Sequence, residues 1–123
     1  MKAVLKSMMI LAILAISNGA SAQSILDFKV VNKTGIIFYT LYVGASSSDS
    51  WGEDLLPSDV LGDEEEVEIK FTRGKVTDCK WDIYLDKDAN GKSHTIVRDI
   101  DLCEVSVLTL KMNDQGKITY STK

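Results

Sequence analysis

In the segment Lys80-Trp81-Asp82-Ile83-Tyr84-Leu85, large apolar side chains alternate with side chains that carry a polar group. Successive side chains of an extended strand point to opposite faces, so Trp81, Ile83 and Leu85 are predicted to face a core. Glu66 to Phe71 repeats the alternation as E-V-E-I-K-F. This period of two favours β-strands with one buried face over amphipathic helices.

Five further segments are predicted to be strands, because they are rich in β-branched and aromatic residues or are bounded by turn residues. They are Ile25 to Asn32, Ile36 to Val43, Ser93 to Arg98, Glu104 to Met112 and Lys117 to Thr122. Seven short strands in about 100 residues are typical of an antiparallel β-sandwich with immunoglobulin-like architecture. A small open β-barrel is the alternative. One short helix is expected from Trp51 to Leu56, before Pro57.

The first 22 residues have the layout of a secretory signal peptide. Lys2 and Lys6 form a positive start, Met8 to Ile16 is an apolar run, and Ala20-Ser21-Ala22 is a cleavage signature. The apolar run is shorter than the ~20 residues of a membrane-spanning helix, so no stable membrane anchor is expected. Cleavage after Ala22 leaves residues 23–123 as a single β-sandwich domain, located in the periplasm or secreted.

The charge of the chain is acidic. It carries 14 Lys and Arg against 18 Asp and Glu, for a formal net charge of −4. Loss of Lys2 and Lys6 with the leader lowers the basic count from 14 to 12 and the net charge from −4 to −6. Such a surface repels phosphate backbones, so nucleic acid is not an expected partner. It suits solubility or an affinity for cations.

The two cysteines, Cys79 and Cys103, are predicted to form a disulfide, because an exported chain meets an oxidising compartment. Closing a loop of about 25 residues stabilises a fold by ~3 to 4 kcal/mol. The bridge is expected to tie two sheets together, as in immunoglobulin-like domains. Two cysteines with one distant histidine make a poor zinc site, and the C-x-x-C pattern of redox pairs is absent.

Four motifs resemble a group of small exported bacterial proteins of unknown function. They are Val31-Asn32-Lys33-Thr34-Gly35, Trp51-Gly52-Glu53-Asp54-Leu55-Leu56, Cys79-Lys80-Trp81-Asp82 and Asp101-Leu102-Cys103-Glu104-Val105. The resemblance covers most of residues 23–123 and implies one exported, β-rich domain with a bridge between its cysteines. It implies no activity.

The segment Asp86-Lys87-Asp88-Ala89-Asn90-Gly91 has oxygen-bearing side chains at alternate positions before a glycine. This is the first half of a calcium loop, in which Asp86, Asp88 and Asn90 are candidate Ca²⁺ ligands. The twelfth position of an EF-hand loop would be Val97 instead of glutamate, so that version is excluded. Asn-Gly is also a favoured β-hairpin turn. Both interpretations stay open, and the plain turn is favoured.

A second candidate site is an interaction surface formed by Asp49, Trp51, Glu53 and Asp54. Its partner would be a protein or an envelope polymer of unknown identity. Aromatic residues at a surface are frequent anchors of binding. For Trp51, however, burial beneath the short helix is favoured, because small domains need their large aromatic residues inside.

Catalytic motifs are sparse. His94 is the one histidine, and the nucleophile motif G-x-S-x-G is absent. We therefore expect a binding or structural module and not an enzyme. The alternative is a small extracytoplasmic hydrolase that uses His94 as its base. Asn32-Lys33-Thr34 is a glycosylation sequon, which has meaning only in a eukaryotic host.

Overall fold

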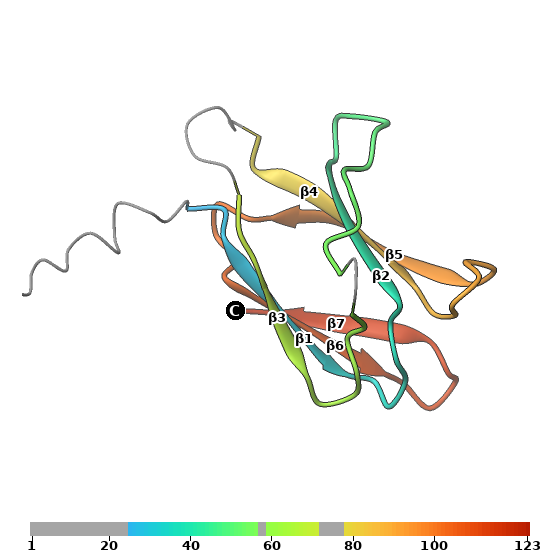
Figure 1. The fold of residues 1–123 in the computed structure, drawn as a ribbon. Coiled ribbons are helices and arrows are strands. Elements are labelled where there is room, and N and C mark those ends of the chain that lie inside the picture. The colour runs from blue at the N-terminus through green and yellow to red at the C-terminus, as the bar shows by residue number, and fades with distance from the viewer. Residues whose placement is uncertain (1–24, 57–58, 72–77) are drawn as a thin grey trace, which may run out of the picture.

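The computed structural model describes residues 25–56, 59–71 and 78–123, so the predicted signal peptide and Pro57 lie outside the described residues. Two β-sheets pack against each other (Figure 1). One has four strands in the order β3-β1-β6-β7, and the other has three in the order β2-β4-β5. The strands are β1 (Phe28–Lys33), β2 (Thr40–Ala45), β3 (Glu66–Ile69), β4 (Lys80–Asp86), β5 (His94–Asp101), β6 (Val107–Met112) and β7 (Ile118–Thr122).

This arrangement confirms the predicted β-sandwich. The barrel alternative is wrong, because the two sheets remain separate and no strand of one pairs with a strand of the other in the described part of the chain. Neighbouring strands are antiparallel with one exception: β1 and β6 run parallel, with Val30 opposite Leu108. Parallel neighbours require a long crossover, and here the connection from β1 to β6 includes four other strands.

The core fills the space between the two sheets. Ile83 and Leu85 of β4 are fully buried, as the alternation of that strand predicts. Trp81 lies at the margin, where it is half-buried and packs edge-on against Phe71 with ring centroids 5.0 Å apart. Other fully buried side chains come from both sheets and their connections: Val30, Phe38, Leu41, Leu102, Leu108 and Leu110.

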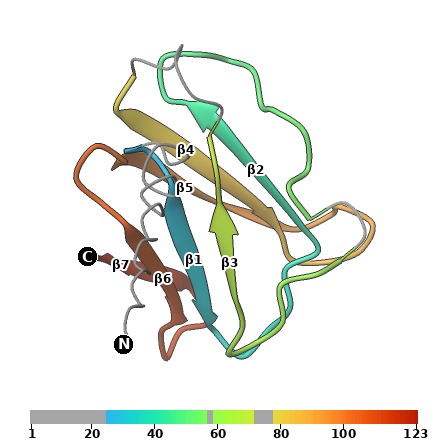
Figure 2. The same cartoon turned by 60° about the vertical axis from the view of Figure 1, so that its left-hand side comes forward.

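The short helix predicted from Trp51 to Leu56 is wrong, because this segment is irregular and runs beside β2 (Figure 2). Leu55 N–H donates to Leu41 O at 2.8 Å. The Asp54 carboxylate accepts hydrogen bonds from Leu41 N at 3.0 Å and from Leu56 N at 2.9 Å. An Asp side chain that bonds nearby backbone offers an alternative to a helix. The segment thereby provides hydrogen-bond partners for backbone groups at the outer edge of β2, which has no neighbouring strand on that side.

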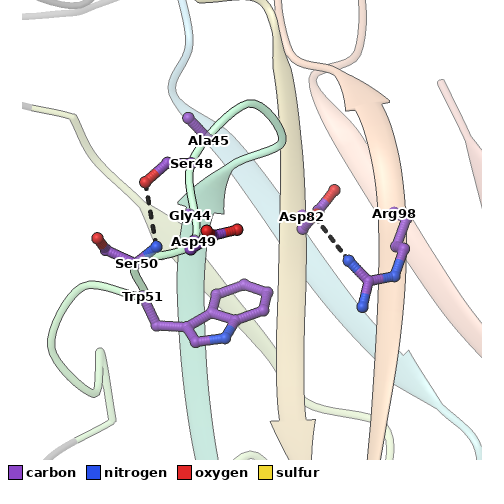
Figure 3. A pocket seen from close by; sticks show the side chains of 8 residues that line it. All are labelled: Gly44, Ala45, Ser48, Asp49, Ser50, Trp51, Asp82 and Arg98. Atoms are coloured by element: carbon purple, nitrogen blue, oxygen red, sulfur yellow. Dashed lines mark hydrogen bonds and ion pairs between the residues drawn. The ribbon is translucent and has the colours of Figure 1, made fainter.

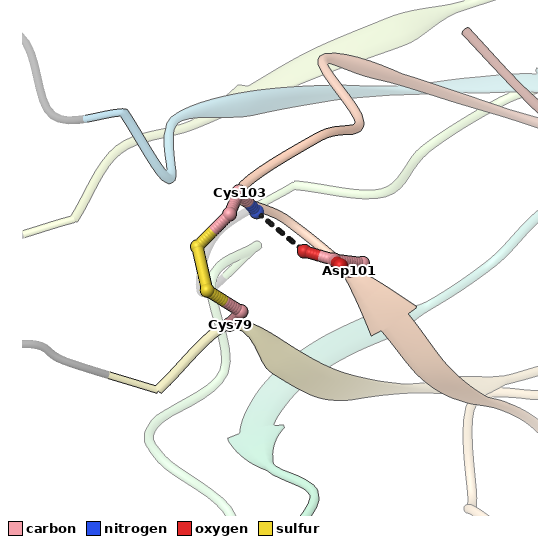
Figure 4. A group of neighbouring side chains, drawn as sticks. All are labelled: Cys79, Asp101 and Cys103. Carbon is pink, nitrogen blue, oxygen red and sulfur yellow. Dashed lines mark hydrogen bonds between the residues drawn. A yellow bond between two sulfur atoms is a disulfide. The ribbon is translucent and has the colours of Figure 1, made fainter.

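The predicted disulfide between Cys79 and Cys103 is present, with Cα atoms 5.2 Å apart (Figure 4). Cys79 directly precedes β4 and Cys103 follows β5, and these strands are neighbours in one sheet. The expectation that the bridge ties two sheets is therefore wrong. The bridge joins the start of β4 to the end of β5, where Leu102 N–H also donates to Cys79 O at 2.8 Å. A disulfide is compatible with an oxidising, extracytoplasmic location.

Asn32, near the end of β1, is completely buried and fully hydrogen-bonded. Its Nδ2 donates to Ile36 O, Leu61 O and Gly62 O at 2.8 to 3.1 Å. Its Oδ1 accepts from the backbone N–H of Thr34 at 3.0 Å and from the Thr34 hydroxyl at 2.6 Å. The amide thus joins the turn after β1 to the bend before β3. An amide enclosed in this way is not accessible for glycosylation in the folded protein.

Candidate functional site

The face of the β2-β4-β5 sheet that points away from the core carries the candidate site. Directly opposed residues of antiparallel strands share a face. Six residues of β2 and β4 form such pairs on this face: Thr40 with Asp86, Tyr42 with Tyr84, and Gly44 with Asp82. The alternation that places Ile83 and Leu85 in the core also places Tyr84, Asp82 and Asp86 on the outer face.

Tyr84 is the centre of an aromatic cluster on this outer face. Its ring centroid lies 5.6 Å from that of Tyr42 and 5.5 Å from that of Trp51. The His94 ring stacks on Tyr84 at 4.7 Å, with an interplanar angle of 16°. Trp51 remains 37% exposed, so the predicted burial of its side chain is wrong. Four rings therefore gather on a sheet face that usually carries polar residues.

Trp51 reaches this cluster because β2 has a glycine beneath it (Figure 3). A Cβ atom placed on Gly44 would lie 2.6 Å from Ser50 O and 3.1 Å from the Trp51 ring. The first distance is too short for any side chain, so Gly44 permits a close approach of the loop to the strand. The loop after β2 and this glycine together position Trp51 against the sheet.

An open groove of about 370 Å³ on this face is lined by Tyr42, Trp51, Tyr84, Asp86 and Gly91. Asp86 is only 8% exposed, and its Oδ2 accepts a hydrogen bond from the Thr40 hydroxyl at 2.6 Å. Asp86 Oδ1 is also buried, yet no described residue provides it with a hydrogen bond. Burial raises the pKa of Tyr84, and the charge of the Asp86 carboxylate and a side-chain hydrogen bond with it raise this pKa further. The groove thus combines three aromatic side chains with one incompletely bonded carboxylate.

A smaller hollow of about 170 Å³ has Trp51, Asp49, Asp82 and Arg98 among its lining residues (Figure 3). Asp82 Oδ1 accepts from the Ser46 hydroxyl at 2.7 Å and from Asp99 N at 2.9 Å, and Oδ2 accepts from Arg98 Nη1 at 3.1 Å. Burial alone would raise the pKa of Asp82, but these hydrogen bonds and the Arg98 charge outweigh burial and lower the pKa below its usual value.

Both oxygens of Asp82 are therefore partnered. The carboxylate supports Asp99, whose φ of 58° lies in the left-handed region that non-glycine residues rarely adopt. This bond stabilises the irregularity where β4 and β5 shift register between Trp81 and Ile83. Asp82 has a structural role in the hollow, in contrast to Asp86 in the groove.

The three candidate calcium ligands lie in two different settings. Asp88 and Asn90 are in the loop of the β4–β5 hairpin, where Asp88 is half-buried and Asn90 is exposed. Lys92 N–H donates to the side chains of both, at 2.8 and 3.3 Å. Gly91 has a φ of 73°, the conformation for which an Asn-Gly turn is suited. Asp86 instead lies on the sheet face beside Thr40. Calcium binding by this loop stays a prediction.

Cys79, Asp101 and Cys103 form the one close group of three potential His, Cys, Asp or Glu metal ligands in the described ranges. The two sulfur atoms of this group are bonded to each other, and Asp101 Oδ1 accepts from Cys103 N at 3.0 Å (Figure 4). The group is therefore a cross-linked corner of the sheet and not a thiolate metal site.

The predicted interaction surface is divided by the structure. Asp49, Trp51 and Glu53 are exposed, and the first two border the smaller hollow. Asp54 is half-buried and its carboxylate binds backbone. His94 is exposed, and its ring stacks on Tyr84. The sequence interpretation missed Tyr42 and Tyr84, because their proximity depends on the pairing of β2 with β4.

Comparison with known proteins supports the fold. No family model matches the chain, and no curated protein matches it. An NMR structure of a protein from Eubacterium rectale is similar, with a TM-score of 0.54 and 10% sequence identity. The match covers 78% of this chain and 85% of that one. At this identity the similarity shows a shared fold alone.

Proposed function

We propose that this chain is an exported binding module whose ligand lies against Tyr42, Trp51 and Tyr84. The supporting observation is the groove on the outer face of the β2-β4-β5 sheet, where these aromatic residues surround a buried carboxylate. Ligand sites combine apolar walls with a few placed polar groups, which is the composition of this groove. Partly exposed aromatic residues are also common anchors of recognition.

The proposed location is the periplasm or the exterior of the cell. The sequence of residues 1–22 and the disulfide both fit an exported chain. The partner is an exported protein or an envelope polymer, and the acidic charge disfavours nucleic acid. Over residues 25–56, 59–71 and 78–123 the structure contains no helical segment with the length and hydropathy of a membrane span. Intact mass with and without reductant tests the leader cleavage and the disulfide.

The binding proposal is tested by titrating isotope-labelled protein, with its disulfide intact, with chemically distinct probes. The panel is n-butylammonium, butyrate, 1-butanol, glucose and N-acetylglucosamine. Two-dimensional NMR reports the Trp51 indole N–H and the backbone amides of β2 and β4. At least one probe is expected to cause saturable shifts at Trp51 and Tyr84. Shifts confined to other surfaces, or no saturable shifts at all, would remove the support for this site.

The competing hydrolase is tested separately by an activity screen with the wild type and His94→Ala. The His94 ring is exposed and stacks on Tyr84, so the substitution is expected to leave the fold intact. We expect no hydrolysis by either protein. A hydrolytic activity that disappears in His94→Ala, with unchanged thermal unfolding, would replace the binding module by an enzyme.

A further inference from the structure

Asp86 has an unusual position for a carboxylate. It is more than nine-tenths buried, and one oxygen is held by Thr40 while the other lacks a hydrogen bond from any residue described. The four ion pairs among the described residues do not include Asp86. A buried carboxylate with an unpaired oxygen lowers the stability of the fold unless a hydrogen-bond donor or a cation binds to it.

The residues around Asp86 narrow the chemistry of that donor. Tyr42, Trp51 and Tyr84 line the same groove and supply aromatic rings. The faces of aromatic rings attract cations, and cages of such rings with acidic residues recognise ammonium groups. An anion would be repelled by Asp86, and a neutral sugar would leave the negative charge uncompensated.

On the basis of the proposed function, we propose that this groove binds an alkyl ammonium group that retains at least one N–H, such as a protonated primary amine. The N–H donates to Asp86 Oδ1, and the positive charge and adjacent methylene groups lie against the three rings. A quaternary ammonium has the charge but no donor, so it satisfies the rings and leaves Oδ1 without a hydrogen bond.

The size and openness of the groove fit such a group. A volume of about 370 Å³ accommodates a short alkyl chain, and Trp51 remains partly exposed along one side. Gly91 also lines the groove, and a Cβ placed there would be in van der Waals contact with Asp86 Oδ1, 3.8 Å away.

The test is a titration of the disulfide-bonded protein with n-butylammonium, tetramethylammonium and 1-butanol at equal ionic strength, with a calcium chelator present. NMR shifts of the Trp51 indole N–H and of the β4 amides report binding. We expect saturation by n-butylammonium, and affinities at least tenfold lower for the other two probes. Equal affinity for 1-butanol would exclude a cation site, and equal affinity for tetramethylammonium would exclude the N–H requirement.

Two substitutions with the same charge change provide the matched control. Asp86→Asn is expected to weaken n-butylammonium binding at least tenfold. Asp88→Asn removes one negative charge from the hairpin loop, where Asp88 is half-buried two residues from Asp86, and is expected to keep the affinity within twofold. Equal losses in both variants would mean that general electrostatic attraction explains binding, and the proposed site would be wrong.

The substitution Trp51→Leu tests the contribution of the aromatic wall to n-butylammonium binding without changing Asp86. Trp51 is partly exposed, so the variant is expected to fold, and its affinity for n-butylammonium should fall severalfold. Unchanged affinity would exclude the aromatic wall. If n-butylammonium does not bind while glucose or butyrate shifts Trp51, the ammonium inference fails and the binding function stands.

The same titration identifies the source of the ammonium group. Nα-acetyl-lysine methylamide presents the amine on a peptide, whereas n-butylammonium represents a free small amine. Tighter binding of the peptide-like probe indicates a lysine side chain of an exported partner. Tighter binding of n-butylammonium indicates a small amine. Either result supports the site, and failure of both probes to bind would overturn it.

Discussion

Asn32 and Asp86 are both buried polar side chains, but their surroundings differ. The Asn32 amide makes five hydrogen bonds, through both its nitrogen and its oxygen, to the turn after β1 and the bend before β3. The Asp86 carboxylate accepts from the Thr40 hydroxyl and interacts with Tyr84, and its buried Oδ1 has no hydrogen-bond partner in the described chain. Buried polar groups that are fully bonded hold a fold together, whereas an incompletely bonded one suggests a ligand.

The two positions also differ in what lies around them. Asn32 is enclosed by backbone carbonyls of the chain itself, so no external group can reach it. Asp86 lies beside an open groove with aromatic walls. Burial of a side chain does not by itself distinguish a structural residue from a binding residue, and the completeness of its hydrogen bonding is the more useful criterion.

The largest expected effect comes from Asn32→Ala. The change leaves Gly62 O, Leu61 O and the Thr34 amide without their side-chain partner inside the fold, which should cost about 3 to 4 kcal/mol of unfolding free energy. Asp86→Asn should cost less than about 1 kcal/mol, because the Asn carbonyl oxygen can still accept from the Thr40 hydroxyl. Urea unfolding of both variants measures the contrast. Equal losses would remove the distinction between the two residues.

Gly44→Ala tests whether the groove depends on the close approach of Trp51 to β2. The added methyl group meets Ser50 O and the Trp51 ring, so the loop must move, at a cost of about 1 to 2 kcal/mol. The Trp51–Tyr84 contact should be lost while the β-sheet circular dichroism is retained. NMR cross-peaks between the two rings provide the measurement. Unchanged cross-peaks would show that Gly44 does not position Trp51.

The sequence-predicted calcium loop is examined by thermal unfolding with calcium against chelator. At calcium ten times the dissociation constant, binding stabilises the folded state by ~1.4 kcal/mol, which corresponds to a shift of about 5 °C in a domain of this size. The shift should disappear in Asp88→Ala. A flat response of the wild type would leave the hairpin as a plain turn, and an equal response of Asp88→Ala would place calcium elsewhere.

The smallest expected effect is the contribution of Asp82 to stability at acidic pH, which adds a third buried polar residue to the comparison of Asn32 with Asp86. Its pKa is lowered in the folded state, so the unfolded state binds the proton first as the pH falls. The stabilisation by Asp82 is complete above about pH 4, the range of an ordinary aspartate, and is lost as the pH falls through the lower folded value. Unfolding of Asp82→Asn should therefore depend less on pH below 4 than that of the wild type. Parallel pH profiles would contradict this.

The sequence predicts much of the fold because period-two alternation is a local property. The segment from Lys80 to Leu85 places Ile83 and Leu85 inside from the pattern alone. The Cys79–Cys103 bridge was predictable from export and an even cysteine count. Its position within one sheet follows from β4 and β5 being neighbours, which the Asn-Gly hairpin turn implies and the analogy with immunoglobulin-like domains obscured.

The candidate site was less predictable because it depends on contacts between distant segments. Trp51 was expected beneath a helix, but Asp54 bonds the edge of β2 and the segment becomes irregular. Tyr42 and Tyr84 meet only through the register of two strands separated by more than 30 residues. In the sequence, Asp86 is part of a calcium motif together with Asp88. Only the folded structure shows that Asp86 lies on the sheet face while Asp88 lies in the hairpin loop.

The disulfide also has a consequence for proteolysis. Cys79 and Cys103 enclose β4, the hairpin and β5 in a covalent ring, and the exposed tip of that hairpin carries Lys92. A protease that cuts at the tip opens the ring but does not separate the two fragments. Tyr84 and His94, which lie on opposite sides of such a cut, would remain parts of one molecule until the bridge is reduced.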